Sequence, residues 1–165
     1  MHIYVDCDGV IMDTERRIMD AFESMPLAHR EERIKEFIRQ LDWYDWMCEC
    51  GQINNAIGVL ASLPPEHISI LTTVQTVAEG AAKVRYFREH GLKNNIIITP
   101  EGCAKSQMVS AKGNILIDDH KENLKAWRAA AGTAIQFHLA KETGEYPIIH
   151  SLGETLEHYL AQITP

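Results

Sequence analysis

Four aspartates follow two short apolar segments of the sequence, which makes them the first candidates for chemistry. Asp6 and Asp8 come after one such segment, and Asp118 and Asp119 directly follow another. Short apolar runs predict buried strands, and the carboxyl ends of parallel strands meet at one edge of a sheet. Carboxylates gathered there repel one another, and burying them is costly unless their charge is compensated. A hard divalent cation provides that compensation, and oxygen ligands indicate Mg²⁺.

Two threonines and a lysine could hold a phosphate group beside such a cation. Thr72 and Thr73 follow a third apolar run, where a hydroxyl and the nearby backbone N–H groups can donate to phosphate oxygens. Either hydroxyl fits this role, and Thr72 is preferred. Lys105 lies between two predicted strands, from where its ammonium group could reach the phosphate. Lys112 and the more remote Lys83 are alternatives to Lys105.

Asp6 and Asp8 suit the two halves of a phosphate ester hydrolysis. A carboxylate such as Asp6 can attack phosphorus and form an acyl phosphate intermediate. Asp8 could then protonate the leaving oxygen and later take a proton from water. Mg²⁺ would neutralise charge on the phosphoryl oxygens, and Gly9 would let the backbone turn sharply next to the substrate. The alternative is that both aspartates are loop residues at a strand end, without chemistry.

Strands and helices alternate along most of the chain. This alternation predicts an α/β fold in which helices flank both faces of a parallel sheet. The expected strands cover residues 3–5, 68–71, 96–98, 115–117 and 134–137. A helical block interrupts the alternation after the first strand. We therefore expect a core of residues 1–14 and 65–165, with a small helical cap of residues 15–64 above the catalytic edge.

The composition limits what the chain can bind. Its 165 residues are 45% hydrophobic, and the formal net charge of -7 argues against broad binding of a nucleic acid polymer. No run approaches the length of a membrane span, and the N-terminus lacks the pattern of a signal peptide. The cysteines form no C-x-x-C pair and are expected to be reduced thiols. These features predict a cytoplasmic protein without a membrane partner.

Four segments in the correct order resemble the motifs of one superfamily. Residues 6–11, Asp-Cys-Asp-Gly-Val-Ile, look like the first motif of the haloacid dehalogenase-like (HAD) hydrolases. Residues 70–72 resemble the second motif, Lys105 the third, and residues 115–119 the fourth. The matches span most of the chain, and together they are far more specific than any one of them.

The resemblance carries expectations about fold, activity and cofactor. It implies a Rossmann-like core and a phosphohydrolase in which Asp6 is the nucleophile and Asp8 the acid/base. It also implies Mg²⁺ held by Asp6, the carbonyl group of Asp8 and Asp118, with Asp119 behind these ligands. Dehalogenases of the superfamily lack the second aspartate of the first motif, so Asp8 favours phosphate chemistry.

Within the superfamily, the chain most resembles the small 5'(3')-deoxyribonucleotidase branch. The grounds are the small helical insert, residues 71–73, and residues 117–119 followed by Asn123 and Trp127. His120 departs from this branch, which usually has Arg there. The resemblance implies a small phosphorylated substrate, in the first place a (deoxy)nucleoside monophosphate.

Three aromatic residues in the cap bear on the choice of substrate. Trp43, Tyr44 and Trp46 could pack the cap against the core, or one of them could stack on a nucleobase. The residues leave three hypotheses open. The chain could be a nucleotide phosphomonoesterase, a phosphatase for a sugar phosphate or another small metabolite, or a HAD fold kept as a binding module without turnover.

Overall fold

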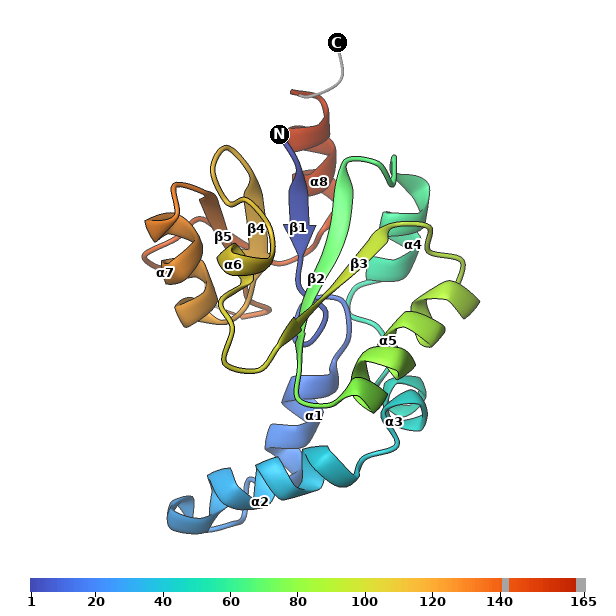
Figure 1. The fold of residues 1–165 in the computed structure, drawn as a ribbon, viewed down its shortest axis with the longest axis vertical. Coiled ribbons are helices and arrows are strands. Elements are labelled where there is room, and N and C mark those ends of the chain that lie inside the picture. Colours follow the sequence, from blue (N-terminus) through green and yellow to red (C-terminus); the bar gives the residue numbers. More distant parts are fainter. Residues whose placement is uncertain (141–142, 163–165) are drawn as a thin grey trace.

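The computed structural model describes residues 1–140 and 143–162 and contains a six-stranded sheet (Figure 1). All neighbouring strands pair in parallel, in the order β3-β2-β1-β4-β5-β6. The strands are β1 (Ile3–Val5), β2 (Ile68–Val74), β3 (Asn95–Pro100), β4 (Ile115–Asp118), β5 (Thr133–Phe137) and β6 (Ile148–Ile149). The predicted α/β fold with a parallel sheet is confirmed.

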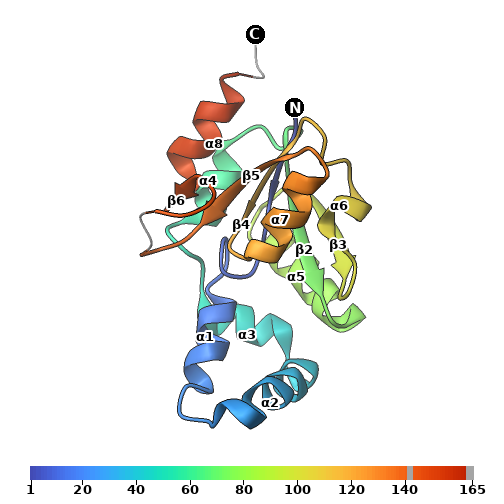
Figure 2. The same cartoon turned by 90° about the vertical axis from the view of Figure 1, so that its left-hand side faces the viewer.

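Helices cover both faces of the sheet, as Figures 1 and 2 show. One face packs against α4 (Ala56–Ser62), α5 (Val77–Glu89) and α8 (Gly153–Leu160). The other face packs against α7 (Lys121–Ala129), beside the short α6 (Lys105–Met108). Side chains of a strand alternate between the two faces: Ile3 and Val5 belong to the first apolar cluster, and Tyr4 belongs to the second.

The register of the strands places the predicted site residues at the same height along the strand direction. Val5 is aligned with Ile70 on one neighbouring strand and with Ile117 on the other. Asp6 and Asp118 each follow an aligned residue, so the two carboxylates leave adjacent strands side by side. The parallel sheet therefore produces the convergence that the strand-end acids predict.

Three helices extend beyond the carboxyl edge of the sheet, between β1 and β2 (Figure 2). They are α1 (Thr14–Ala21), α2 (Leu27–Gln40) and α3 (Trp43–Cys50). Asp42 caps α3, because its side chain accepts hydrogen bonds from the backbone of Tyr44 at 3.0 Å and Asp45 at 3.1 Å. The sequence did not predict α3, since eight residues with adjacent aromatic and acidic side chains give a weak helical period.

The inserted helices are joined to the core through a paired neck, formed by residues 11–13 and 51–53. Met12 forms a β-bridge with Gln52, and the backbone N–H of Ile53 donates to the carbonyl of Ile11 at 2.8 Å. The two connecting segments therefore run side by side and hold each other in place.

Helix α4 lies on the core side of this neck. Its residues Ala56, Ile57 and Leu60 are buried in the same apolar cluster as β1. The division into a core of 1–14 and 65–165 and a cap of 15–64 stays a prediction, and these contacts argue for a narrower cap of α1 to α3. Residues 141–142 and 163–165 of the predicted core lie outside the described residues.

Among the helices of the described residues, none is both long enough and apolar enough to cross a membrane.

The placement of α4 can be tested by truncating one side chain. Leu60 is fully buried, whereas Ile34 of α2 is only half-buried. We expect Leu60→Ala to lower the free energy of unfolding by about 3 kcal/mol, because it leaves a cavity in the sheet core. Ile34→Ala, the matched control, should cost less than about 1.5 kcal/mol. Urea unfolding of both variants measures this, and equal losses would contradict the assignment of α4 to the core.

Candidate active site

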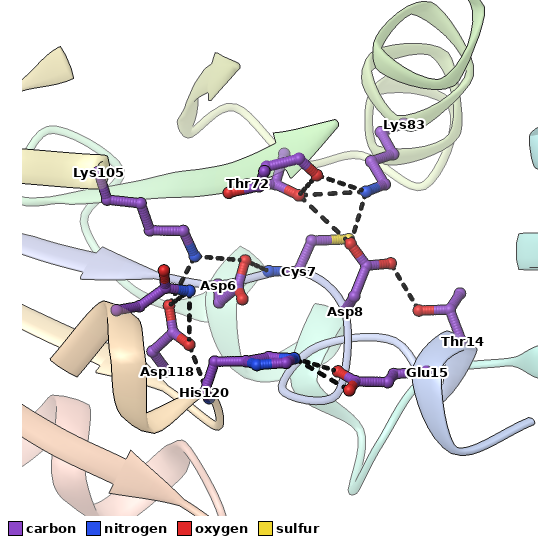
Figure 3. Close-up of polar contacts among 12 residues, drawn as sticks. Asp6, Cys7, Asp8, Thr14, Glu15, Thr72, Lys83, Lys105, Asp118 and His120 are labelled. Carbon is purple, nitrogen blue, oxygen red and sulfur yellow. Dashed lines mark hydrogen bonds and ion pairs between the residues drawn. The ribbon is translucent and has the colours of Figure 1, made fainter. Parts of the chain in front are cut away.

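A buried lysine joins two of the predicted catalytic aspartates. Lys105, the first residue of α6, lies with its Nζ 2.8 Å from Asp6 Oδ1 and 2.6 Å from Asp118 Oδ2 (Figure 3). All three side chains are buried. Asp6 comes from the end of β1, and Asp118 is the last residue of β4. The structure thus brings together three residues that the sequence places more than a hundred positions apart at the extremes, at 6 and 118.

Further donors fix Asp118 from the start of α7. The backbone N–H of His120 donates to Asp118 Oδ1 at 2.8 Å, and the side-chain amide of Asn123 lies 3.1 and 3.0 Å from the two carboxylate oxygens. This carboxylate is therefore held in one orientation. Asn123, which the sequence offered only as part of a branch resemblance, has a defined contact here.

A second lysine holds Asp8. Lys83 of α5 is fully buried, and its Nζ lies 2.5 Å from Asp8 Oδ2 and 2.7 Å from Glu79 Oε1. The hydroxyl of Thr14 donates to the other oxygen of Asp8 at 2.6 Å. Sequence reasoning considered Lys83 remote from the site. The available signal was its position one helical turn after Glu79, in the helix that follows the strand carrying Thr72.

The two threonines lie differently at the site. Thr72 is fully buried, and its hydroxyl faces Lys83 at 3.2 Å and Asp8 at 3.4 Å. Thr73 instead lines a cavity of about 280 Å³. The other residues that line this cavity are Asp6, Asp8, Glu15, His120 and Asn123. This placement favours Thr73 over Thr72 as the residue that reaches a bound phosphate.

A glycine is required at position 9 because the carboxyl group of Asp119 leaves no room for a side chain there. Its φ is +73°, a conformation that side chains rarely adopt, and a Cβ at this position would lie 2.1 Å from Asp119 Oδ2. The backbone of the first motif therefore packs directly against the carboxyl group of Asp119. Any side chain at residue 9 would displace this group from the edge of the site.

Burial and mutual repulsion disturb the titration of these acids. Burial, together with the charges of Asp118 and Asp8, raises the pKa of Asp6 to about 7, although Lys105 acts in the opposite direction. Burial and the negative charges of Asp6 and Glu15 raise the pKa of Asp119 to about 9. The site without a metal ion therefore carries more negative charge than it can stabilise.

The donor set fits a divalent cation. One carboxylate oxygen from each of Asp6, Asp118 and Asp119 lies within 4.8 Å of the others. Oδ1 of Asp119 is buried without a hydrogen-bond partner in the part of the chain that the structure describes. An all-oxygen set with an unsatisfied buried oxygen is the environment that Mg²⁺ prefers. The residues that would hold it are Asp6 and Asp118, with Asp119 beside them.

His120 connects the core to α1 at the rim of the cavity. Its Nε2 lies 2.9 Å from Glu15 Oε1, and this hydrogen bond is the main reason that the pKa of His120 is raised to about 9. His120 is exposed and directly precedes α7, but its side chain does not cap that helix.

The predicted aromatic cluster packs between helices and not into the cavity. The indole ring of Trp43 covers Lys83, with Nζ 4.9 Å from the ring centroid. Tyr44 packs under Arg85, whose guanidinium carbon lies 4.0 Å from its ring centroid, and Trp46 packs edge-on against Phe37. A stacking role for one of them stays a prediction, and these contacts favour the packing alternative.

Comparison with known proteins supports the fold. No family model and no curated protein matches this sequence. A family IA HAD hydrolase from Entamoeba histolytica is 14% identical with a TM-score of 0.63, and the match covers 98% of each chain. The D,D-heptose 1,7-bisphosphate phosphatase of Burkholderia thailandensis is 12% identical with a TM-score of 0.58, covering 96% of this chain and 97% of that one.

A HAD hydrolase from Bacillus subtilis, solved with magnesium bound, is 15% identical with a TM-score of 0.58, covering 97% of this chain and 98% of that one. These likenesses show that the chain has the fold of the HAD-superfamily hydrolases. They give no support to the narrower deoxyribonucleotidase branch.

The shared lysine can be tested without any assay of activity. We expect Lys105→Met to lower the free energy of unfolding by about 3 kcal/mol, because it leaves Asp6 and Asp118 buried without their cation. Urea unfolding in the presence of a chelator measures this. The exposed Lys112, the sequence-level alternative, provides the control: Lys112→Met should change stability by less than about 0.5 kcal/mol. Similar values for both would show that Lys105 does not hold the two carboxylates.

Proposed function

We propose that this protein is a magnesium-dependent phosphomonoesterase that forms an aspartyl-phosphate intermediate on Asp6. The observation that carries this proposal is the Asp6–Lys105–Asp118 arrangement, which opens on a cavity and has a set of oxygen donors suited to Mg²⁺. The superfamily fold supports the same chemistry.

The residues divide the reaction between them. A carboxylate oxygen of Asp6 attacks phosphorus, and the bond from phosphorus to the leaving oxygen breaks as Asp8 gives that oxygen a proton. Water then attacks the phosphoryl group, Asp8 takes its proton, and the bond to Asp6 breaks to release phosphate. Lys105 orients Asp6 at 2.8 Å throughout, and Thr73 donates to the phosphoryl group. Bound Mg²⁺ supplies neutralisation of the negative charge on the phosphoryl oxygens.

The same geometry gives less support to a module without turnover. Asp6 is contacted by the buried ammonium group of Lys105, and it also lines the cavity, where a ligand can reach it. Asp8 faces the same cavity. We also keep the predicted cytoplasmic location, with which the free state of Cys7, Cys48, Cys50 and Cys103 agrees.

For the substrate class, we propose a small phosphorylated metabolite, with a (deoxy)nucleoside monophosphate as the narrower alternative. A cavity of about 280 Å³ lies at the small end of ligand sites. The aromatic side chains that could stack on a base are engaged elsewhere. The Burkholderia thailandensis protein with this fold is a phosphatase of a heptose bisphosphate, which fits the broader class.

A panel of phosphate esters decides between these classes. We expect phosphate release from small sugar or acid phosphates to exceed release from deoxynucleoside monophosphates, as measured by kcat/KM, because no Trp, Tyr or Phe side chain of the described residues lines the cavity to bind a base. Para-nitrophenyl phosphate serves as the reference substrate. A preference for deoxynucleotides over every small ester would reverse this choice.

The nucleophile is tested by an isosteric change. We expect Asp6→Asn to retain less than about a tenth of the wild-type kcat with para-nitrophenyl phosphate, a loss of more than about 1.4 kcal/mol of barrier stabilisation. The amide has nearly the same shape but is a poor nucleophile. Asp45→Asn, at an exposed position of α3, is the control and should keep full activity. An Asp6→Asn variant more active than this limit would make another group the nucleophile.

The cation site is tested by direct binding. We expect Asp118→Asn to weaken magnesium affinity at least about tenfold in titration calorimetry, because a charged oxygen ligand is replaced by a neutral one. Asp20→Asn, on the exposed face of α1, should bind as the wild type does. Unchanged affinity in Asp118→Asn would place the cation elsewhere.

A further inference from the structure

Lys83 is enclosed on every side by groups that accept hydrogen bonds or attract a cation. Its side chain is fully buried, and Nζ lies within reach of carboxylates at 2.5 and 2.7 Å, the Thr72 hydroxyl at 3.2 Å and the Thr73 carbonyl at 3.3 Å. An ammonium group has only three N–H donors, so all of them are engaged. Lys83 does not line the cavity, and it therefore acts through the residues it contacts.

Glu79 anchors Lys83 from the start of α5. One oxygen of Glu79 accepts from Lys83, and the other accepts from the backbone N–H of Gln75 at 2.8 Å. The backbone N–H of Glu79 in turn donates to the Thr76 hydroxyl at 3.0 Å. Glu79 is thus held at one oxygen by the backbone just before α5 and at the other by Lys83. Glu79 therefore gives Lys83 a second ion pair, which is independent of Asp8.

Asp8 is held between two structural units. Lys83, from the core helix α5, binds Oδ2, while Thr14, the first residue of the inserted helix α1, binds Oδ1 (Figure 3). Both oxygens of the carboxylate are thereby fixed in direction. The orientation of Asp8 depends on how the inserted helices sit relative to the core.

Trp43 makes the second connection between the inserted helices and this lysine. Its ring lies 4.9 Å from Lys83 Nζ, and its indole N–H donates to the carbonyl of Ile38 at 3.3 Å. An aromatic face attracts a cation, most strongly where water is excluded. Trp43 is itself only 6% exposed, so its ring covers Lys83 in an environment that excludes water. An apolar lysine substitute would fill this space without the cost of burying charge, so packing alone does not require the ion pair.

We propose that Lys83 is a positioning residue that holds Asp8 in orientation, and that Trp43 covers it so that the inserted helices control Asp8 through Lys83. The inference rests on the proposed function only in giving Asp8 the acid/base role. Of the three aromatic residues, it gives Trp43 an indirect effect on catalysis, through Lys83 and Asp8, without contact with the substrate.

The experiment compares kcat and KM for para-nitrophenyl phosphate, at saturating magnesium, among variants of the full chain. In Lys83→Met, kcat falls by up to about 100-fold while KM changes less than about threefold, because substrate binding is kept and the geometry of Asp8 is lost. The double variant Glu79→Gln with Lys83→Met removes one of the two carboxylates that the loss of Lys83 leaves unpaired, so it recovers part of the thermal stability without recovering kcat. A folded double variant with wild-type kcat overturns the proposal.

Trp43 and Trp46, both in α3, provide a matched test of whether Trp43 acts by covering Lys83. Trp43 contacts Lys83, whereas Trp46 contacts Phe37 on α2. Trp43→Leu lowers kcat more than Trp46→Leu does, by about tenfold, for the same change of side chain. Equal effects of the two substitutions on kcat show that Trp43 only packs, and they overturn its part in the proposal.

A measurement without turnover separates this inference from the proposed function. If the wild type releases no phosphate, the proposed function fails. The interaction between Lys83 and Asp8 can still be measured, as a change in Tm in thermal unfolding. Lys83→Met lowers Tm in the wild type by more than it does in an Asp8→Asn background, because the second background has already lost the pair. An equal loss of Tm in both backgrounds overturns the proposal.

Discussion

Two buried ammonium groups divide the carboxylates at the carboxyl edge of the sheet, and the remaining features of the site follow from that division. Lys105 forms ion pairs with Asp6 and Asp118, and Lys83 forms ion pairs with Asp8 and Glu79. Asp119 is left without a cation, with a raised pKa and an unsatisfied oxygen. If all five carboxyl groups are ionised, two lysines leave three negative charges in excess, which a divalent cation reduces to one.

The two ion-paired groups differ in their surroundings and in the structural units that hold them. The Lys105 group borders the cavity through Asp6, so a phosphate could approach this carboxylate while the lysine holds it from the other side. The Lys83 group is covered by Trp43, and it ties Asp8 to helices of both the core and the insert. Asp6, the proposed nucleophile, is thus held by residues of the core alone. Asp8, the proposed acid/base, is held by contacts from two structural units, and a shift of one unit against the other would change its orientation.

The sequence predicts the convergence of Asp6, Asp8 and Asp118, because strand ends of a parallel sheet share an edge and apolar runs mark the strands. Lys105 could be placed there for the same reason, since it lies between two strands. Lys83 could not, because the direction in which a helical side chain points depends on how the helix docks on the sheet. The choice between Thr72 and Thr73 depends on the side-chain alternation of β2, and the sequence leaves its register open. The sequence did not predict helix α3 because the helix is short, and the contacts that Trp43 makes from this helix could not be predicted either.

The paired neck between residues 11–13 and 51–53 has a consequence for how such a chain can diversify. The bridge between Met12 and Gln52 brings the two ends of the inserted helices together while the core stays closed beneath them. The chain between these two residues therefore leaves and re-enters the core through one pair of adjacent segments. Helices could be lengthened, shortened or replaced there without altering the register of any strand. The neck is therefore a position at which a foreign loop or domain could be joined to the same core.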